Sequence, residues 1–226
     1  MQKKIIIANF KAYFTPDQLD TWCEQFLASL RSPAAQIEVV LAMPIIALPR
    51  IQKRMQGSTV SLAAQTLSSF PQGSYTGSTP AAWLRDIVQY SLVGHRERRK
   101  YFHEGVQDVA RQAAEAISEE IKPIVCVEGE QFMPQLASFT DEQRDHLIWA
   151  FTPETGGTLE MSRDLQEIEN AVGQMVLRSG RRPVLYGGGV TGKNCASLLQ
   201  IPGLNGLLMG KACHDPILFA QLINQL

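Results

Sequence analysis

The chain has 226 residues, of which 45% are hydrophobic, and its formal net charge is -1. This length and apolar content are enough to fill one core, so we expect a single domain over residues 1–226. The near balance of 21 basic and 22 acidic residues argues against nucleic acid as a partner. The longest apolar runs, such as Val39–Leu48, are too short to span a bilayer, so we also expect no membrane partner.

Eight short runs rich in β-branched residues recur along the chain. Most are almost continuously apolar, which is typical of parallel strands that are covered on both faces. The predicted strands are Lys4–Asn9, Glu38–Pro44, Val60–Gln65, Ser91–His95, Pro123–Val127, Leu147–Phe151, Pro183–Gly188 and Gly206–Gly210.

Amphipathic segments between these runs predict helices. Thr15 and Gln18 form a capping-box pattern around Pro16, which predicts a helix that runs to about Leu30. Further helices are predicted at Val106–Glu119, at Ser162–Leu177 and from Asp215-Pro216 onward. Strands that alternate with helices indicate a parallel α/β fold, but the pattern alone does not separate a closed barrel from an open doubly wound sheet.

The four cysteines are Cys23, Cys126, Cys195 and Cys213. None has the spacing of a metal-binding Cys/His motif, so we expect neither a metal nor a cofactor. Cys23 lies on the inward face of a predicted helix, and Cys126 lies inside an apolar strand. Buried reduced thiols fit a cytoplasmic protein.

Polar or glycine-rich segments follow three of the predicted strands. They are Asn9-Phe10-Lys11, Gly94-His95-Arg96-Glu97-Arg98-Arg99 and Tyr186-Gly187-Gly188-Gly189-Val190-Thr191-Gly192. Each has an ordinary structural interpretation as a turn or a satisfied side chain. In a barrel, however, active-site groups lie at the carboxyl ends of the strands, so their joint appearance predicts a site.

In these segments the sequence resembles the triosephosphate isomerase family, and the matches run from residue 5 to residue 212. Ile5–Lys11 resembles the opening strand of that family, and Val93–Arg99 resembles its Gly-His-Ser-Glu-Arg-Arg segment with Arg96 in place of serine. Tyr186–Asn194 resembles its phosphate loop, with Gly189 in place of serine. The other matching segments are Ala64–Gln65, Gly73–Gly77, Pro123–Glu130 and Gly206–Ala212.

The resemblance implies a single (β/α)8 barrel and an aldose–ketose isomerase without a cofactor. It implies a small phosphorylated sugar as substrate, with glyceraldehyde 3-phosphate and dihydroxyacetone phosphate, the pair of glycolysis and gluconeogenesis, as leading candidates. The family is a well-known example of a neutral histidine that acts with a carboxylate base, so that assignment is taken over from the family. Carried over, His95 polarises the carbonyl, Lys11 supplies positive charge, and Asn9 binds a substrate oxygen. Backbone N–H groups would hold the phosphate at Gly188, Gly189, Gly210 and Lys211.

The resemblance fails at the catalytic base. The family has Ala-Tyr-Glu-Pro at the end of the sixth strand, and this chain has Ala150-Phe151-Thr152-Pro153. Thr152 has no basic group, so it cannot abstract a carbon-bound proton. Glu154 lies two residues on, which keeps strand parity, although Pro153 argues that the chain leaves the sheet there. Glu154 is therefore either a replacement base or a solvated loop carboxylate.

Two further departures alter the predicted site. The lid that follows Pro153 is about two residues shorter than in the family, and the fifth helix is reduced to a turn or two. Arg96 and Lys211 add positive charge beside the site: either Arg96 pairs with Glu154 or with an acidic group of a different ligand, or both side chains face solvent. Three functions stay open: a triose phosphate isomerase with reduced activity, a barrel that only binds a phosphorylated metabolite, and an isomerase of a four-carbon keto-phosphate.

The segment Gln72–Gly77 resembles the loop with which family members contact a second subunit. Tyr75 is an aromatic residue at its tip, a residue type that is common at interface centres. The resemblance therefore implies a homodimer.

Overall fold

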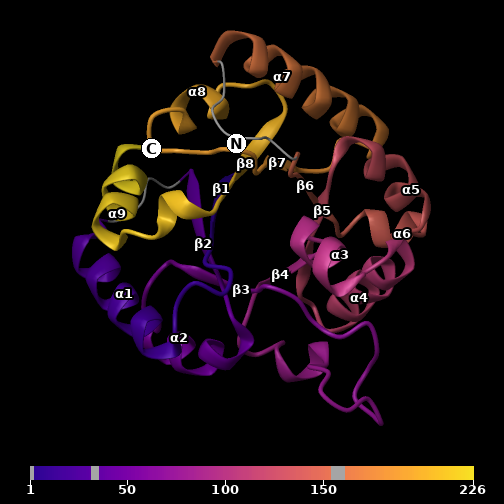
Figure 1. Cartoon of the computed structure of the whole chain (residues 1–226), viewed down its shortest axis with the longest axis horizontal. Helices are drawn as coiled ribbons and strands as arrows, with labels where there is room; N and C mark the ends of the chain where they lie inside the picture. The colour runs from indigo at the N-terminus through magenta and orange to yellow at the C-terminus, as the bar shows by residue number, and fades with distance from the viewer. Residues whose placement is uncertain (1–2, 32–35, 154–160) are drawn as a thin grey trace.

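Eight parallel strands close into a barrel in which each strand pairs with the next and β8 pairs with β1. This computed structural model describes residues 3–31, 36–153 and 161–226. Figure 1 shows the strands in the middle and the helices in a ring around them. The strands are β1 Lys4–Asn9, β2 Ile37–Met43, β3 Ser61–Ala64, β4 Tyr90–Val93, β5 Lys122–Val127, β6 Ile148–Phe151, β7 Val184–Tyr186 and β8 Leu204–Met209. The prediction of a (β/α)8 barrel is confirmed, and an open sheet is excluded.

Nine α-helices connect the strands in the described part of the chain. They are α1 Pro16–Ser29, α2 Leu48–Arg54, α3 Arg96–Phe102, α4 Val106–Ser118, α5 Phe132–Ala137, α6 Asp141–Arg144, α7 Met161–Arg178, α8 Cys195–Leu199 and α9 Pro216–Gln225. The short α5 and α6 between β5 and β6 agree with the prediction of a reduced fifth helix.

Local capping explains where two of the predicted helices begin. The Thr15 hydroxyl accepts the Gln18 N–H, and the Gln18 side chain accepts the Thr15 N–H, which is a capping box. Asp215 caps α9 in a similar way by accepting two backbone N–H groups. These bonds satisfy N–H groups that have no partner inside the helix.

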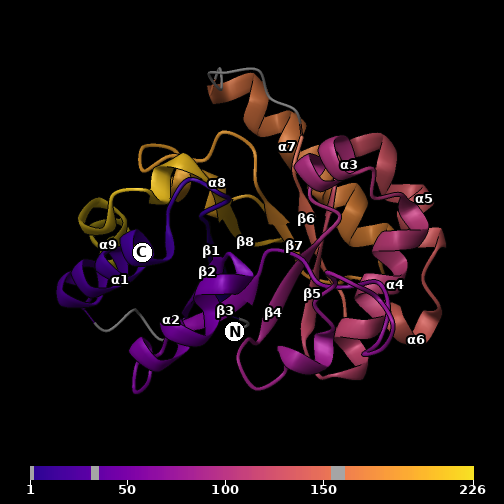
Figure 2. The same ribbon diagram turned by 60° about the horizontal axis from the view of Figure 1, so that its bottom comes forward.

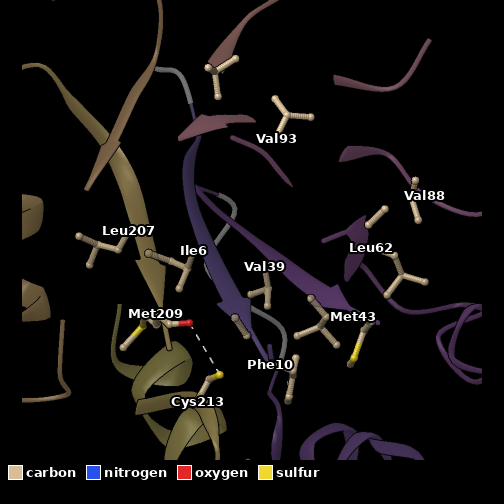
Figure 3. Close-up of a cluster of buried hydrophobic side chains, with 14 of the residues drawn as sticks. Ile6, Phe10, Val39, Met43, Leu62, Val88, Val93, Leu207, Met209 and Cys213 are labelled. Atoms are coloured by element: carbon tan, nitrogen blue, oxygen red, sulfur yellow. Dashed lines mark hydrogen bonds between the residues drawn. The ribbon is translucent and has the colours of Figure 1, made fainter. Parts of the chain in front are cut away.

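Alternate residues of each strand enter two separate apolar layers. Ile5 and Ile7 belong to a cluster whose members all come from strands, so this cluster fills the barrel interior. Ile6 and Ala8 belong to the larger cluster between the barrel and its helices. Figure 3 shows part of that outer layer, with Ile6 beside residues of β2 and β8. The period of two therefore divides the core into an inner and an outer part.

The ring closes where β8 lies against β1, and one glycine permits the contact. Ile5 pairs with Gly206, and a Cβ added to Gly206 would lie 1.9 Å from the Ile5 carbonyl oxygen. Since all eight strands are parallel, their carboxyl ends meet at one mouth. Figure 2 shows the segments that follow β4, β7 and β8 at the same end of the barrel.

All four cysteines are buried and free, as the sequence analysis predicted. Burial raises the pKa of the Cys126 thiol to about 12, which keeps it protonated and unreactive. Among the described helices, none is both long enough and apolar enough to cross a membrane.

We expect Gly206→Ala to prevent barrel closure, since the new methyl group would overlap a backbone atom that cannot rotate away. The loss should be about 3 kcal/mol or more in the free energy of unfolding, measured in urea. Gly173→Ala is the matched control, because a Cβ at Gly173 on α7 meets nothing within 4 Å, and alanine favours a helix by about 1 kcal/mol. Equal stabilities of the two variants would contradict this account of closure.

Candidate functional site

A cavity of about 1170 Å³ opens at the carboxyl ends of the strands. Lys11 after β1, His95 after β4 and Thr152 after β6 line it. The turn 187–193 after β7 and the segment 210–212 after β8 complete this part of the wall. The cavity therefore brings together segments that are up to 200 residues apart, as expected of parallel strands.

Lys11 lies in a strained backbone conformation that its neighbours hold in place. Its φ is 50°, which costs about 1–2 kcal/mol for a residue with a Cβ. Its N–H donates to Asn9 Oδ1 at 3.1 Å. The Gln65 amide donates to Asn9 Oδ1 at 3.3 Å, to the Lys11 carbonyl at 3.1 Å and to the Ala42 carbonyl at 3.0 Å. Strain that is held in this way is typical of functional positions.

Asn9, unlike Lys11, is buried and does not line the cavity. It is 3% exposed, and its side chain oxygen accepts from Lys11 and Gln65 rather than lining the cavity. In this structure Asn9 supports the backbone under Lys11, and its predicted contact with a substrate oxygen stays a prediction.

The Lys11 ammonium group forms an ion pair with Glu97. Lys11 Nζ lies 2.6 Å from Glu97 Oε1, and the other carboxylate oxygen lies 3.6 Å from His95 Nδ1. Both side chains are about one third exposed, so the pair adds little to stability. The ion pair instead positions the Lys11 amine, which it holds beside the His95 ring.

His95 follows β4 directly and is the N-cap of α3. The prediction put it in the fourth strand, but that strand ends at Val93. His95 Nδ1 accepts the Glu97 N–H at 3.3 Å, so the proton of the neutral ring lies on Nε2. Nε2 is thus the nitrogen that can donate to a ligand in the cavity.

Burial makes the neutral form of His95 the stable one. The pKa of the ring is lowered to about 4, chiefly by burial; Glu97 raises this pKa, while Lys11 and Arg96 lower it. The contact with Glu97 is therefore not an ion pair at neutral pH. A neutral imidazole that donates from Nε2 is suited to polarising a carbonyl without giving up its proton completely.

A half-buried arginine fixes the backbone that presents His95. Arg99 donates to the Gly94 carbonyl at 2.7 Å, to the Cys126 carbonyl at 3.2 Å and to Gln135 Oε1 at 2.8 Å. Gly94 has φ 67°, and a Cβ there would lie 2.6 Å from the guanidinium. The sequence motif around His95 contains Arg99, but it does not reveal this supporting role.

Thr152 occupies the mouth at the end of β6. It is 2% exposed, and its N–H donates to the Val127 carbonyl at 2.9 Å, which continues the sheet. Its hydroxyl donates weakly to the same oxygen at 3.4 Å. No general base is present at this position. Glu154, the predicted replacement, lies outside the described residues, as does the lid whose length the sequence analysis predicted.

The glycine-rich turn after β7 lies close to its own strand. A Cβ on Gly188 would lie 2.6 Å from the Tyr186 hydroxyl oxygen, and Gly189 has φ 58°. Asn194 braces the turn, since its amide donates to the Gly189 carbonyl and its oxygen accepts the Thr191 N–H. The turn is a rigid wall of backbone groups that an anion can approach closely.

The segment after β8 forms the other side of this wall. A Cβ on Gly210 would lie 3.8 Å from Lys11 Cε, so the lysine stem passes over this glycine. Lys211 begins a short 3₁₀ turn, Lys211–Cys213, whose last carbonyl accepts the indole N–H of Trp22 at 3.0 Å. The predicted phosphate-binding glycines and Lys211 therefore line one cavity with Lys11 and His95.

Arg96 also lines the cavity, and its Nε lies 4.0 Å from Glu128 Oε1. Glu128 directly follows β5. It is not one of the partners that the sequence analysis expected for Arg96, and the expected pairing with Glu154 lies outside the described residues. Among the described lining residues, Glu97 is the only carboxylate.

Comparisons with known proteins agree with this geometry. The triosephosphate isomerase family model matches residues 4–226. A triosephosphate isomerase of Paracidovorax citrulli is 32% identical over 248 residues, covering 98% of each chain. Another, of Trichodesmium erythraeum, is 31% identical over 241 residues, covering 99% of each chain. A third, of Lactobacillus acidophilus, is 28% identical and covers 97% of each chain.

We expect the His95 ring to stay neutral far below the usual pKa of about 6.5. The unfolded chain binds this proton first, so the free energy of unfolding should fall between pH 6.5 and pH 4 by about 2–3 kcal/mol. Imidazole NMR shifts should give a midpoint near 4, with the signal assigned by its absence in His95→Gln. The same variant should show a flatter dependence of stability on pH. A midpoint above pH 6 would contradict the neutral assignment.

Proposed function

We propose that this chain, which belongs to the triosephosphate isomerase family, interconverts glyceraldehyde 3-phosphate and dihydroxyacetone phosphate, and that it does so slowly. The observation that carries the proposal is the neutral His95 beside Lys11, facing the glycine turn across one cavity. Isomerisation through an enediol needs an electrophile at the carbonyl oxygen, a cation for developing charge and a phosphate cradle. The described residues offer a candidate for each.

In this proposal the substrate phosphate lies against the backbone at Gly188, Gly189 and Gly210. His95 donates from Nε2 to the carbonyl oxygen, where negative charge develops as the enediol forms. Lys11 stabilises that charge and the phosphate, and the Glu97 contact holds its amine in place. None of these steps removes the carbon-bound proton.

The proton transfer is the step for which the described site has no suited group. Thr152 stands where a base is needed, and both oxygens of Glu97 face Lys11 or His95. General base catalysis typically contributes about 10²–10⁴-fold to a rate. We therefore expect the isomerisation rate to be lower by this factor than in an enzyme with a base, unless Glu154 supplies the carboxylate.

A second candidate function follows from the same residue. A barrel with the electrophile and the cradle but without a base would bind a phosphorylated metabolite and leave it unchanged. The buried Thr152 favours this alternative, and kinetics with glyceraldehyde 3-phosphate and a four-carbon keto-phosphate separates the possibilities.

We expect Thr152→Glu to raise kcat for glyceraldehyde 3-phosphate about 10²-fold, because it places a carboxylate at the cavity wall. Thr152→Gln is the matched control, with the same size and no base, and should give no increase. The coupled assay is run beside the Paracidovorax citrulli relative, and the unmodified chain should be at least about 10²-fold slower.

Glu154→Gln decides where the remaining activity comes from. If Glu154 is the base, this variant loses all turnover, and binding of the substrate persists. A wild-type rate equal to that of the relative, together with an unaffected Glu154→Gln variant, would refute the proposed loss of the base.

We also propose that the chain works as a homodimer, in the cytoplasm. The connection between β3 and β4 extends beyond the ring of helices in Figure 1. Its Phe70 and Tyr75 rings stack at 4.6 Å, and Tyr75 is 42% exposed. Gln112 on α4 donates to the Leu67 carbonyl at 3.0 Å, which ties this connection to its own barrel. An ordered aromatic tip is suited to a pocket of a second subunit.

We expect Tyr75→Asp to weaken the dimer at least about 30-fold, as for an interface residue worth about 2 kcal/mol. Light scattering after size-exclusion chromatography at micromolar concentration measures the change. Leu177→Asp is the control, because Leu177 is 71% exposed near the end of α7, and Figure 1 shows α7 away from the connection between β3 and β4. A wild-type chain that is purely monomeric would exclude the dimer.

A further inference from the structure

The cavity is longer than the site described above. Beyond Lys211 it continues to α9, where four residues line it. Their spacing of three, four and seven places them on one face of the helix. They are Leu218, Gln221, Leu222 and Gln225. Lys193, at the end of the glycine turn, lines the same cavity.

The packing of α9 explains why this face stays open. The opposite face packs on α1, where Phe219 lies 5.5 Å from Phe26 and 6.1 Å from Trp22 between ring centroids. Figure 1 shows α9 beside α1. Leu218 is 61% exposed on the open side. We call this part of the cavity the α9 groove, defined by Lys193 and the four α9 residues.

Positive charge is concentrated where the α9 groove meets the glycine turn. Lys193 and Lys211 both line the cavity and are exposed, and neither forms an ion pair within residues 3–31, 36–153 and 161–226. Glu97, the one carboxylate among the described lining residues, already pairs with Lys11. Two lysines thus face the cavity without a compensating carboxylate in the described structure.

The positive charges of Lys11 and Lys211 also affect a neighbouring histidine, His214. Burial lowers the pKa of His214, and Lys11 and Lys211 lower it further. Lys11 and Lys211 therefore both lie close enough to His214 to act on the same region of the cavity wall. Lys193, the last residue of the glycine turn, lines the same cavity.

We propose that the cavity binds a diphosphate ester, with one phosphate at Gly188–Gly189 and Lys211, the second at Lys193, and the organic group along the α9 groove. The inference rests on the proposed function for the position of the first phosphate, and it extends the substrate class beyond short monophosphates. Two linked anionic groups match two exposed lysines that line the same cavity as the glycine turn. The ester group covers Leu218, and the two glutamines offer hydrogen bonds to its polar atoms.

Calorimetry with inorganic pyrophosphate and orthophosphate, at matched ionic strength, tests the second phosphate position. Pyrophosphate should bind about fivefold more tightly, the value of one exposed charge pair near 1 kcal/mol. Lys193→Gln should remove this difference and leave orthophosphate affinity unchanged. Lys53→Gln, a change of an exposed lysine on α2, is the control and should keep the difference.

The α9 groove is tested with methyl and butyl diphosphate. Butyl diphosphate should bind about tenfold more tightly, because its additional methylene groups leave water. Leu218→Ser should reduce this gain with little effect on folding, since Leu218 is largely exposed.

Equal binding of pyrophosphate and orthophosphate, or a preference that survives Lys193→Gln, would overturn the inference alone. Absence of binding by either anion would overturn both the inference and the phosphate cradle of the proposed function. Turnover of glyceraldehyde 3-phosphate without any preference for pyrophosphate would leave the proposed function intact and refute the diphosphate site.

Discussion

Closure of the sheet between β1 and β8 is the constraint on which the site depends. The Ile5 backbone approaches Gly206 so closely that no side chain fits between them. This contact joins the two ends of the chain and turns eight parallel strands into a ring. In a closed ring the segments after β1, β4, β6, β7 and β8 surround one mouth. Every distance between Lys11, His95 and the glycine turn follows from that closure.

The mouth of the barrel has well-supported groups for stabilising negative charge but no base at position 152. The electrophilic part is rigid: Gln65 supports the strained Lys11 backbone, Arg99 fixes the loop before His95, and Asn194 braces the glycine turn. These supports hold the groups that we propose stabilise negative charge on a bound ligand. At the position of the base, however, Thr152 completes the sheet and offers only a weakly bonded hydroxyl. The described site is therefore built to bind and polarise an anion more completely than to move a proton.

The same excess of positive over negative charge extends from the proposed reaction site into the wider cavity. A site without a carboxylate at Thr152 has one negative charge fewer, and Lys193 and Lys211 add positive charge at the rim. Such a site favours ligands with more negative charge, because the cost of bringing anionic groups together is offset by the lysines. The open face of α9 provides space for a larger ligand in the same cavity. The threonine at position 152 and the extension of the cavity are thus consistent with the proposed diphosphate ligand.

The sequence by itself determined the features that depend on local patterns. Apolar runs located all eight strands to within about two residues, and the Thr15 and Asp215 caps located the starts of α1 and α9. The resemblance located Lys11, His95, the glycine turn and the substitution at Thr152. These signals are readable because strand burial and capping act over a few residues, and a motif keeps its residue types in order.

Tertiary structure alone decided what depends on contacts between distant segments. Barrel closure needs the pairing of β1 with β8, which no pattern of short range encodes. The proton position on His95 follows from its place as the N-cap of α3 and from burial in the mouth. Strand parity places Asn9 on the same face as Ile5 and Ile7, but its partner there is the amide of Gln65, 56 residues away. The α9 groove exists because α9 packs its aromatic face on α1, a choice between neighbours that only the folded chain makes.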